Sequence, residues 1–145
     1  MTDDASRASH LNNLTERIIG CAFTVGTTLG PGYLEKVYEN ALAHELRKAG
    51  LAVEQQRRMT VWYDGIAVGE YVTDLVVEDA VLVELKAARG LTAANEAQCI
   101  NCLTTTRLPL GLLLNFGPRV DVRRLVGPSA PIFPATQPEH DWEDV

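Results

Sequence analysis

The sequence predicts a single α/β domain in which helices flank a mixed central β-sheet. The order of apolar patterns along the chain is helix, helix, three strands, helix and two strands. A length of 145 residues is that of one ordinary domain. The composition, 46% hydrophobic and 22% charged, is typical of a chain that buries a core.

Two helices are expected at the N-terminal end. Apolar residues recur at helical spacing over 11–29, and the Gly-Pro-Gly of 30–32 ends that helix. A second apolar stripe covers 34–46, and Gly50 stands where a helix C-cap favours glycine. Residues 1–9 are expected to form a loose lead-in.

Three strands follow. Residues 53–63 are rich in β-formers, and Asp64-Gly65 is a strong signal for a hairpin turn. The second strand covers 66–77, with a break expected near its glycine. Glu78-Asp79 turns the chain again into a third strand over 80–87.

The C-terminal half is expected to hold one helix and two strands. Thr92 is a plausible N-cap for a helix that ends near Thr106. Residues 110–116 are almost entirely apolar, which indicates a buried strand. Residues 120–126 form the last strand, at an edge of the sheet.

The expected domain covers residues 10–127, and the termini 1–9 and 128–145 are expected to be flexible or extended. The net charge is −6, but four acidic residues fall within the last seven, which leaves −2 for the rest. A nearly neutral body can carry a local basic strip, although scattered solvated charges are an equal alternative. The basic candidates are Arg57, Arg58, Lys86, Arg89, Arg107, Arg119, Arg123 and Arg124.

The location expected for the protein is cytoplasmic. No apolar run approaches the roughly 20 residues that span a bilayer, and Met1–Asp4 is unlike a secretory segment. Cys99 and Cys102 form a C-x-x-C motif, which could indicate redox or zinc chemistry. The pair is expected inside a helix, without a second pair, so packing in the core is the favoured interpretation.

A candidate metal site arises in the hairpin of the second and third strands. A tight turn at Glu78-Asp79 places Asp74 opposite Glu84 or its neighbour. Because side chains alternate along a strand, Lys86 shares the face of Glu84, and Asp74 joins them. Two carboxylates beside an apolar core repel each other and are costly to desolvate. A divalent cation removes that cost, and oxygen ligands suit Mg²⁺ or Mn²⁺.

The alternative is an ordinary cross-strand ion pair of Lys86 with Asp74 or Glu84 on a solvated face. Two further residues favour a functional site. Glu35 flanks the apolar stripe of the second helix, so that it can point toward the sheet. Gln98 is expected on the inward stripe of the third helix, with Cys102.

At these residues the sequence resembles the GxxExxY proteins, a family placed in the PD-(D/E)XK nuclease superfamily. The resemblance covers about residues 10–126. It rests on Gly32, Glu35 and Tyr38 in a G-x-x-E-x-x-Y motif, on Asp74, Glu84-Leu85-Lys86 and Gln98, and on the run Leu112-Leu113-Leu114-Asn115-Phe116-Gly117. Three positions depart from the family pattern: Gly26 and Asn95 replace a common histidine, and Cys102 replaces a common tyrosine.

The resemblance implies a restriction-endonuclease-like core and metal-assisted phosphodiester hydrolysis. Asp74 and Glu84 would hold Mg²⁺ or Mn²⁺, with the Leu85 carbonyl and Glu35 as further ligands. Lys86 would orient or deprotonate the attacking water, and Gln98 would position water. The expected substrate contacts are Tyr38, Arg57, Arg58 and Arg89.

The function expected is therefore that of a metal-dependent nuclease acting on nucleic acid, DNA rather than RNA. Two alternatives remain: a non-catalytic module that binds nucleic acid or protein, and hydrolysis of a different substrate. Association with a second copy of the chain is compatible with the sequence.

Overall fold

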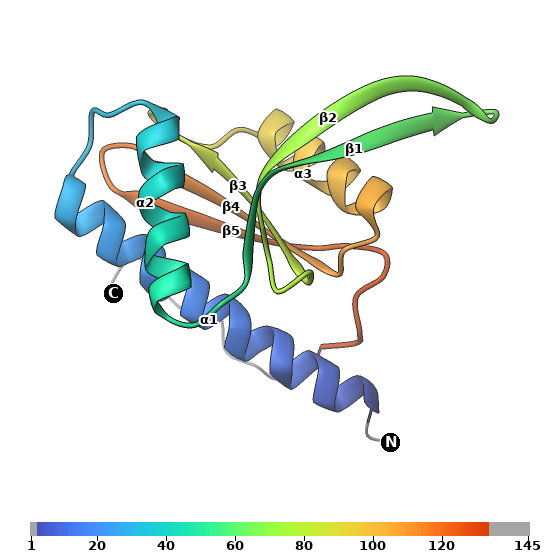
Figure 1. The fold of residues 1–145 in the computed structure, drawn as a ribbon, viewed down its shortest axis with the longest axis horizontal. Coiled ribbons are helices and arrows are strands. Elements are labelled where there is room, and N and C mark those ends of the chain that lie inside the picture. Colours follow the sequence, from blue (N-terminus) through green and yellow to red (C-terminus); the bar gives the residue numbers. More distant parts are fainter. Residues whose placement is uncertain (1–2, 134–145) are drawn as a thin grey trace.

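The computed structural model describes residues 3–133, and its element order confirms the order expected from the sequence. Within this range five strands form one sheet, and three helices pack on it (Figure 1). The elements are α1 (Asp3–Leu29), α2 (Glu35–Lys48), β1 (Val53–Tyr63), β2 (Ile66–Val77), β3 (Val81–Lys86), α3 (Ala93–Thr106), β4 (Leu110–Phe116) and β5 (Val120–Val126).

The strands follow the order β1-β2-β3-β4-β5 across the sheet. Neighbours are antiparallel except for β3 and β4, which are parallel, so the sheet is mixed as predicted. A parallel pair needs a crossover connection, and α3 supplies it. Every residue of β4 is buried, and β5 is an edge strand, as its sequence indicated.

The helices cover opposite faces of the sheet. α1 and α2 pack on one face, where Leu75 and Val83 belong to the larger hydrophobic core. α3 packs on the other face, where Val76 and Leu82 contact its buried side chains. Because side chains alternate along a strand, the β3 residues on the face of Leu82 also point to the α3 side.

β1 and β2 continue beyond the sheet as a long two-stranded ribbon (Figure 1). Its turn is Asp64-Gly65, and both residues have positive φ angles, 52° and 75°, as the favoured hairpin turn requires. The pairing register of the ribbon shifts between Val61 and Trp62. Val61 pairs with Gly69, the residue near which the sequence predicted a break.

Two predicted helix boundaries are confirmed by their local chemistry. The Thr92 hydroxyl accepts a hydrogen bond from the Asn95 N–H, and the Asn95 side chain accepts one from the Thr92 N–H. This reciprocal capping box begins α3. After α1, Gly30 and Gly32 adopt φ angles of 72° and 111°, which side chains disfavour.

The N-terminal lead-in differs from the expectation. Residues 3–9 are the first turns of α1, and Ala8 is buried because the helix lies along the sheet. At the other end, the Ile132 N–H donates to Asp4, and the ring of Phe133 lies under the Arg124 guanidinium at 4.5 Å. The rest of the predicted tail, with its acidic cluster, falls outside the described residues.

No helix in residues 3–133 is long and apolar enough to cross a membrane. Even α1, with 27 residues, has two aspartates in its first turn. Its buried residues face the core of the domain.

Candidate active site

The hairpin of β2 and β3 brings two predicted acidic residues together. Leu75 pairs with Val83, and the same register places Asp74 opposite Glu84, which is one of the two pairings expected from the sequence. Pairing between β2 and β3 stops there, because β2 continues with β1 into the projecting ribbon (Figure 1). The two carboxylates therefore lie where the strands separate.

Backbone amides hold both carboxylates in place. The Leu85 N–H donates to Asp74 Oδ2 over 2.8 Å, and the Asp74 N–H donates to Glu84 Oε1 over 3.3 Å. These bonds take the place of backbone–backbone hydrogen bonds at the position where β2 and β3 separate. The N–H groups of Asp74 and Leu85 therefore both keep a partner. Support by main-chain groups gives the carboxylates the fixed orientation that a catalytic site needs.

The two carboxyl groups lie in a place that disfavours negative charge. Burial raises the pKa of Glu84 to about 8, and the charge of Asp74 adds to the effect. Burial also raises the pKa of Asp74, with a contribution from the charge of Glu39. Lys86 opposes both shifts but does not cancel them. A site of this kind favours a proton or a cation.

Lys86 is half-buried beside this pair. Within residues 3–133 it forms no ion pair with a carboxylate, so the cross-strand salt bridge considered above is absent. Asn115, its neighbour on β4, binds both backbone groups of Ala88, at 2.9 and 3.0 Å. The chain leaving β3 is thereby fixed just after Lys86.

The donor set fits a cation that keeps part of its water shell. In the described range no three His, Cys, Asp or Glu side chains are arranged to hold a metal ion. Asp74 and Glu84 would supply two carboxylates, and the Leu85 carbonyl is adjacent in the chain. Mg²⁺ commonly binds one or two carboxylates and takes its other ligands from water and substrate phosphates.

Glu35 does not point toward the sheet, contrary to the expectation. It is exposed on the first turn of α2, whereas Glu39, one turn later, is only 3% exposed. Both glutamates share the stripe of Leu42 and Leu46, but Glu35 is the first residue of α2, whereas Glu39 is one turn further along, where the helix is buried. Helical spacing from these leucines fits both glutamates, so the sequence did not distinguish Glu39 from Glu35.

Glu39 reaches the site through β1. The side chains of Gln55 and Gln56 donate to its two carboxylate oxygens over 2.7 and 2.8 Å, and Lys36 lies 3.0 Å away. Consecutive strand residues normally point to opposite faces. Gln56 breaks that alternation with a φ of 57°, and the register places it opposite Asp74. The negative charge of Glu39 is therefore close enough to raise the pKa of Asp74.

Gln98 borders the site from the α3 side. It lines a cavity of about 20 Å³ together with Glu84 and Lys86, which is room for about one water molecule. Gln98 is exposed rather than on the inward stripe, which Cys99 and Cys102 occupy. The cavity nevertheless brings three of the predicted residues together.

The cysteines pack as expected. Both Cys99 and Cys102 are free and buried within α3, and burial raises their pKa values to about 12 and about 11. The thiols are therefore protonated at neutral pH, and both side chains belong to the hydrophobic core under α3.

The departures from the family pattern have structural explanations. Cys102 belongs to the core under α3, and Asn95 forms the capping box. A Cβ atom at Gly26 would lie 2.2 Å from a methyl carbon of Val120, so α1 approaches β5 too closely there for a larger residue without repacking.

The three arginines expected to contact substrate differ in their surroundings. Arg57 forms ion pairs with Glu54 and Asp79 at 2.9 and 2.7 Å, so it is already engaged near the hairpin turn. Arg58 is exposed on β1, and Arg89 is exposed in the loop after β3.

Tyr38 does not have the surroundings of a substrate contact. It is 1% exposed, and its ring stacks on Phe116 with centroids 4.7 Å apart. Its hydroxyl donates to the Gly30 carbonyl over 2.6 Å and accepts from the Tyr33 N–H over 3.2 Å. Tyr38 therefore holds the loop between α1 and α2.

Tyr38→Phe is expected to lower the free energy of unfolding by about 1 kcal/mol, because it removes these hydrogen bonds but keeps the stacked ring. Urea denaturation measures this change. Nucleic-acid affinity of the folded variant should match that of wild type. Tyr33→Phe, at an exposed ring, is the control and should change neither property. A stable Tyr38→Phe variant with weakened nucleic-acid binding would contradict the structural role.

The chain was compared with protein families, curated proteins and solved structures. The family model described as the PD-(D/E)XK nuclease superfamily matches residues 12–125. A solved structure described as "Crystal structure of SSO0001" is 17% identical, with a TM-score of 0.48 over 64% of this chain. The chain spans about half the length of that protein, since the match covers 50% of it. None of the curated proteins is significantly similar to the chain. The match over residues 12–125 shows that the chain belongs to the PD-(D/E)XK nuclease superfamily.

Proposed function

We propose that this chain is a divalent-cation-dependent nuclease, of the GxxExxY type, that hydrolyses phosphodiester bonds of nucleic acid. The observation that supports this most directly is the pair of partly buried carboxylates of Asp74 and Glu84. They are held by backbone amides, and Lys86 lies beside them without an ion-pair partner among the described residues. Membership of the superfamily makes nucleic acid the expected substrate.

Each residue of the proposed site has a separate role. Asp74 and Glu84 would hold Mg²⁺ or Mn²⁺, together with the Leu85 carbonyl. Such a cation, when bound, polarises a phosphoryl oxygen and lowers the pKa of water. Lys86 orients the attacking water and offsets negative charge on the phosphate.

Two glutamine side chains support this arrangement. Gln98 lines the water-sized cavity beside Glu84 and Lys86, where it can position a water molecule. Gln56, held by Glu39, fixes the point at which β1 passes Asp74. Glu39 takes the place that the sequence suggested for Glu35.

Phosphates that flank the scissile bond would meet arginines that form no ion pair within residues 3–133. Arg58 and Arg89 are exposed on β1 and in the loop after β3, and arginine binds phosphate oxygens through two parallel hydrogen bonds. DNA is the substrate we propose to test first.

The test is cleavage of single- and double-stranded DNA and RNA with Mg²⁺, with Mn²⁺ and with EDTA. Wild type should cut at least one of these substrates, and EDTA should stop the reaction. Asp74→Asn should bind the cation at least tenfold more weakly in a calorimetric titration, because a ligand is lost. Asp79→Asn, in the turn of the same hairpin and 77% exposed, is the matched control and should behave as wild type.

A folded wild-type protein that cuts none of these substrates would contradict the proposal. The non-catalytic binding module would then be the better description of the chain. Unchanged cation binding in Asp74→Asn would remove Asp74 from the site.

A further inference from the structure

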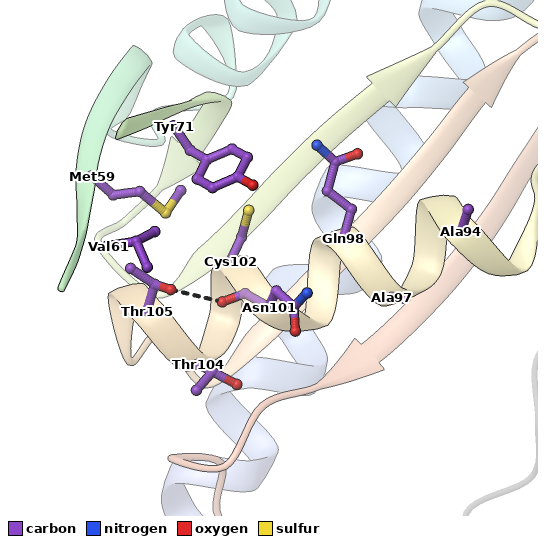
Figure 2. Close-up of a pocket in the computed structure, with 10 residues that line it drawn as sticks. All are labelled: Met59, Val61, Tyr71, Ala94, Ala97, Gln98, Asn101, Cys102, Thr104 and Thr105. Carbon is purple, nitrogen blue, oxygen red and sulfur yellow. Dashed lines mark hydrogen bonds between the residues drawn. The ribbon is translucent and has the colours of Figure 1, made fainter. Parts of the chain in front are cut away.

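A groove next to the candidate active site has no role in the function proposed so far. It has a volume of about 580 Å³ and lies between the β1-β2 ribbon and α3 (Figure 2). Met59, Val61 and Tyr71 line it from the ribbon, and Ala97, Gln98 and Asn101 line it from α3. The volume is typical of sites that enclose an organic ligand.

The groove is continuous with the catalytic cavity. Tyr71, Gln98 and Cys102 line both, and the smaller cavity also contains Glu84 and Lys86. A chain whose phosphate lay at the carboxylates would therefore pass its neighbouring groups directly into the groove.

The lining of the groove is unsuited to phosphate. Among its lining residues none is acidic or basic. Nucleic-acid backbones are held by Lys and Arg, whereas bases are held by stacking and by hydrogen bonds to their edges. The groove offers groups that can stack on bases and hydrogen-bond to their edges, and its lining has no Lys or Arg to hold phosphate.

Hydrogen-bonding groups in the groove are free to meet a base. Figure 2 shows the Tyr71 ring with its hydroxyl directed to the side on which Gln98 lies. Within residues 3–133, the side chains of Tyr71, Gln98 and Asn101 have no hydrogen-bond partner, whereas the hydroxyl of Thr105 is bound to the Asn101 carbonyl. Side-chain amides pair well with base edges, and an aromatic ring supports a base by stacking.

On this basis we propose that the groove binds unpaired nucleobases adjoining the cleaved bond, so that the preferred substrate is a single strand. This rests on the proposed function. Paired bases remain stacked inside a duplex and must be extruded before they can enter a groove. A duplex should therefore bind the groove more weakly than a single strand. Because the residues lining the groove are uncharged, they favour exposed bases over phosphate groups.

The experiment compares two variants that add the same ring to α3. Ala97→Phe fills the groove, whereas Ala93→Phe places the ring at the exposed first residue of α3, outside it. Binding of 15-nucleotide DNA and RNA strands, and of the matching blunt DNA duplex, is measured by fluorescence anisotropy in EDTA. Circular dichroism confirms that both variants fold.

Wild type should bind a single strand more tightly than the duplex. Ala97→Phe should weaken single-strand binding at least tenfold, which is about the contribution of one stacked base, and Ala93→Phe should not. Equal or tighter binding of the duplex would overturn the proposal. Equal affinities of the two variants for the single strand would also overturn it. A third contradicting outcome is that Ala97→Phe alone changes the sedimentation of the protein while single-strand binding is unchanged, since a second copy of the chain would then occupy the groove.

Failure of this inference can be told from failure of the proposed function. If wild type binds single strands through the groove but cuts nothing with Mg²⁺ or Mn²⁺, the nuclease assignment fails and the groove assignment stands. If it cuts duplex DNA and Ala97→Phe cuts equally well, the groove assignment is overturned and the nuclease stands.

Discussion

Lys86→Ala is expected to lower the rate of cation-dependent phosphodiester cleavage by about 10²–10⁴-fold, the contribution typical of a positioned acid–base group. Cation binding should change much less, because the ammonium is not a ligand. The fold should survive, since Lys86 is only half-buried and forms no ion pair among the described residues. Single-turnover cleavage and a calorimetric titration measure the two effects separately.

The controls separate charge from proton transfer. Lys48→Ala removes an exposed lysine that pairs with Glu45, and it should cleave as wild type does. Lys86→Arg keeps the positive charge but cannot give up a proton near neutral pH. Full activity in Lys86→Arg would show that charge alone matters, and full activity in Lys86→Ala would exclude Lys86 from the reaction.

Glu84→Gln is expected to have opposite effects on activity and stability. Cleavage should be lost, because a metal ligand is replaced by a neutral amide. The cation-free variant should nevertheless be more stable than wild type at pH 8, since wild type must ionise Glu84 in a buried site beside Asp74. Such a gain on removing a functional group is typical of strained active sites.

The pH dependence follows from the direction of the shift. The pKa of Glu84 is raised in the folded state from an ordinary value of 4.5 to about 8. The folded state therefore holds its proton more tightly, and the stability this gives is complete below about pH 4.5 and is lost as the pH rises toward 8. In EDTA, wild type should lose about 2–4 kcal/mol of unfolding free energy between pH 5 and pH 8 from this group.

Urea denaturation at the two pH values checks this prediction. Glu84→Gln should show a flatter profile, whereas Glu70→Gln, at an exposed position on β2, should follow wild type. Added Mg²⁺ should stabilise wild type at pH 8 and leave Glu84→Gln unchanged. Identical profiles for wild type and Glu84→Gln would mean that Glu84 ionises freely and that its surroundings impose no cost.

The register that brings Asp74 to Glu84 was predictable to within one residue because it is set locally. A short turn at Glu78-Asp79 joins the two strands, and both turn residues adopt positive φ angles. A hairpin of fixed loop length has a fixed register, and the period of two then assigns each side chain to a face. The capping box of α3 was predictable for the same reason, since Thr92 and Asn95 lie within one turn.

The contribution of α2 was not predictable in the same way. Glu35 and Glu39 lie one helical turn apart and therefore on the same side of α2, so their spacing does not decide which of them is buried. Glu35 is the first residue of α2 and is exposed, whereas Glu39 lies one turn further along, next to the core residues Leu42 and Leu46. The same packing buries Tyr38 and turns a candidate substrate contact into a structural residue.

The sequence alone thus determined the element order, the β2-β3 register to within one residue and the expected convergence of Asp74, Glu84 and Lys86, because each depends on contacts between near neighbours in the chain. Only the tertiary structure showed that Glu39 is buried and bound by Gln56, and that Gln98 lines the cavity beside Glu84 and Lys86. It also placed the neutral groove between the ribbon and α3. These features depend on how elements distant in sequence pack, and local periodicity does not encode the rotation or bend that packing imposes.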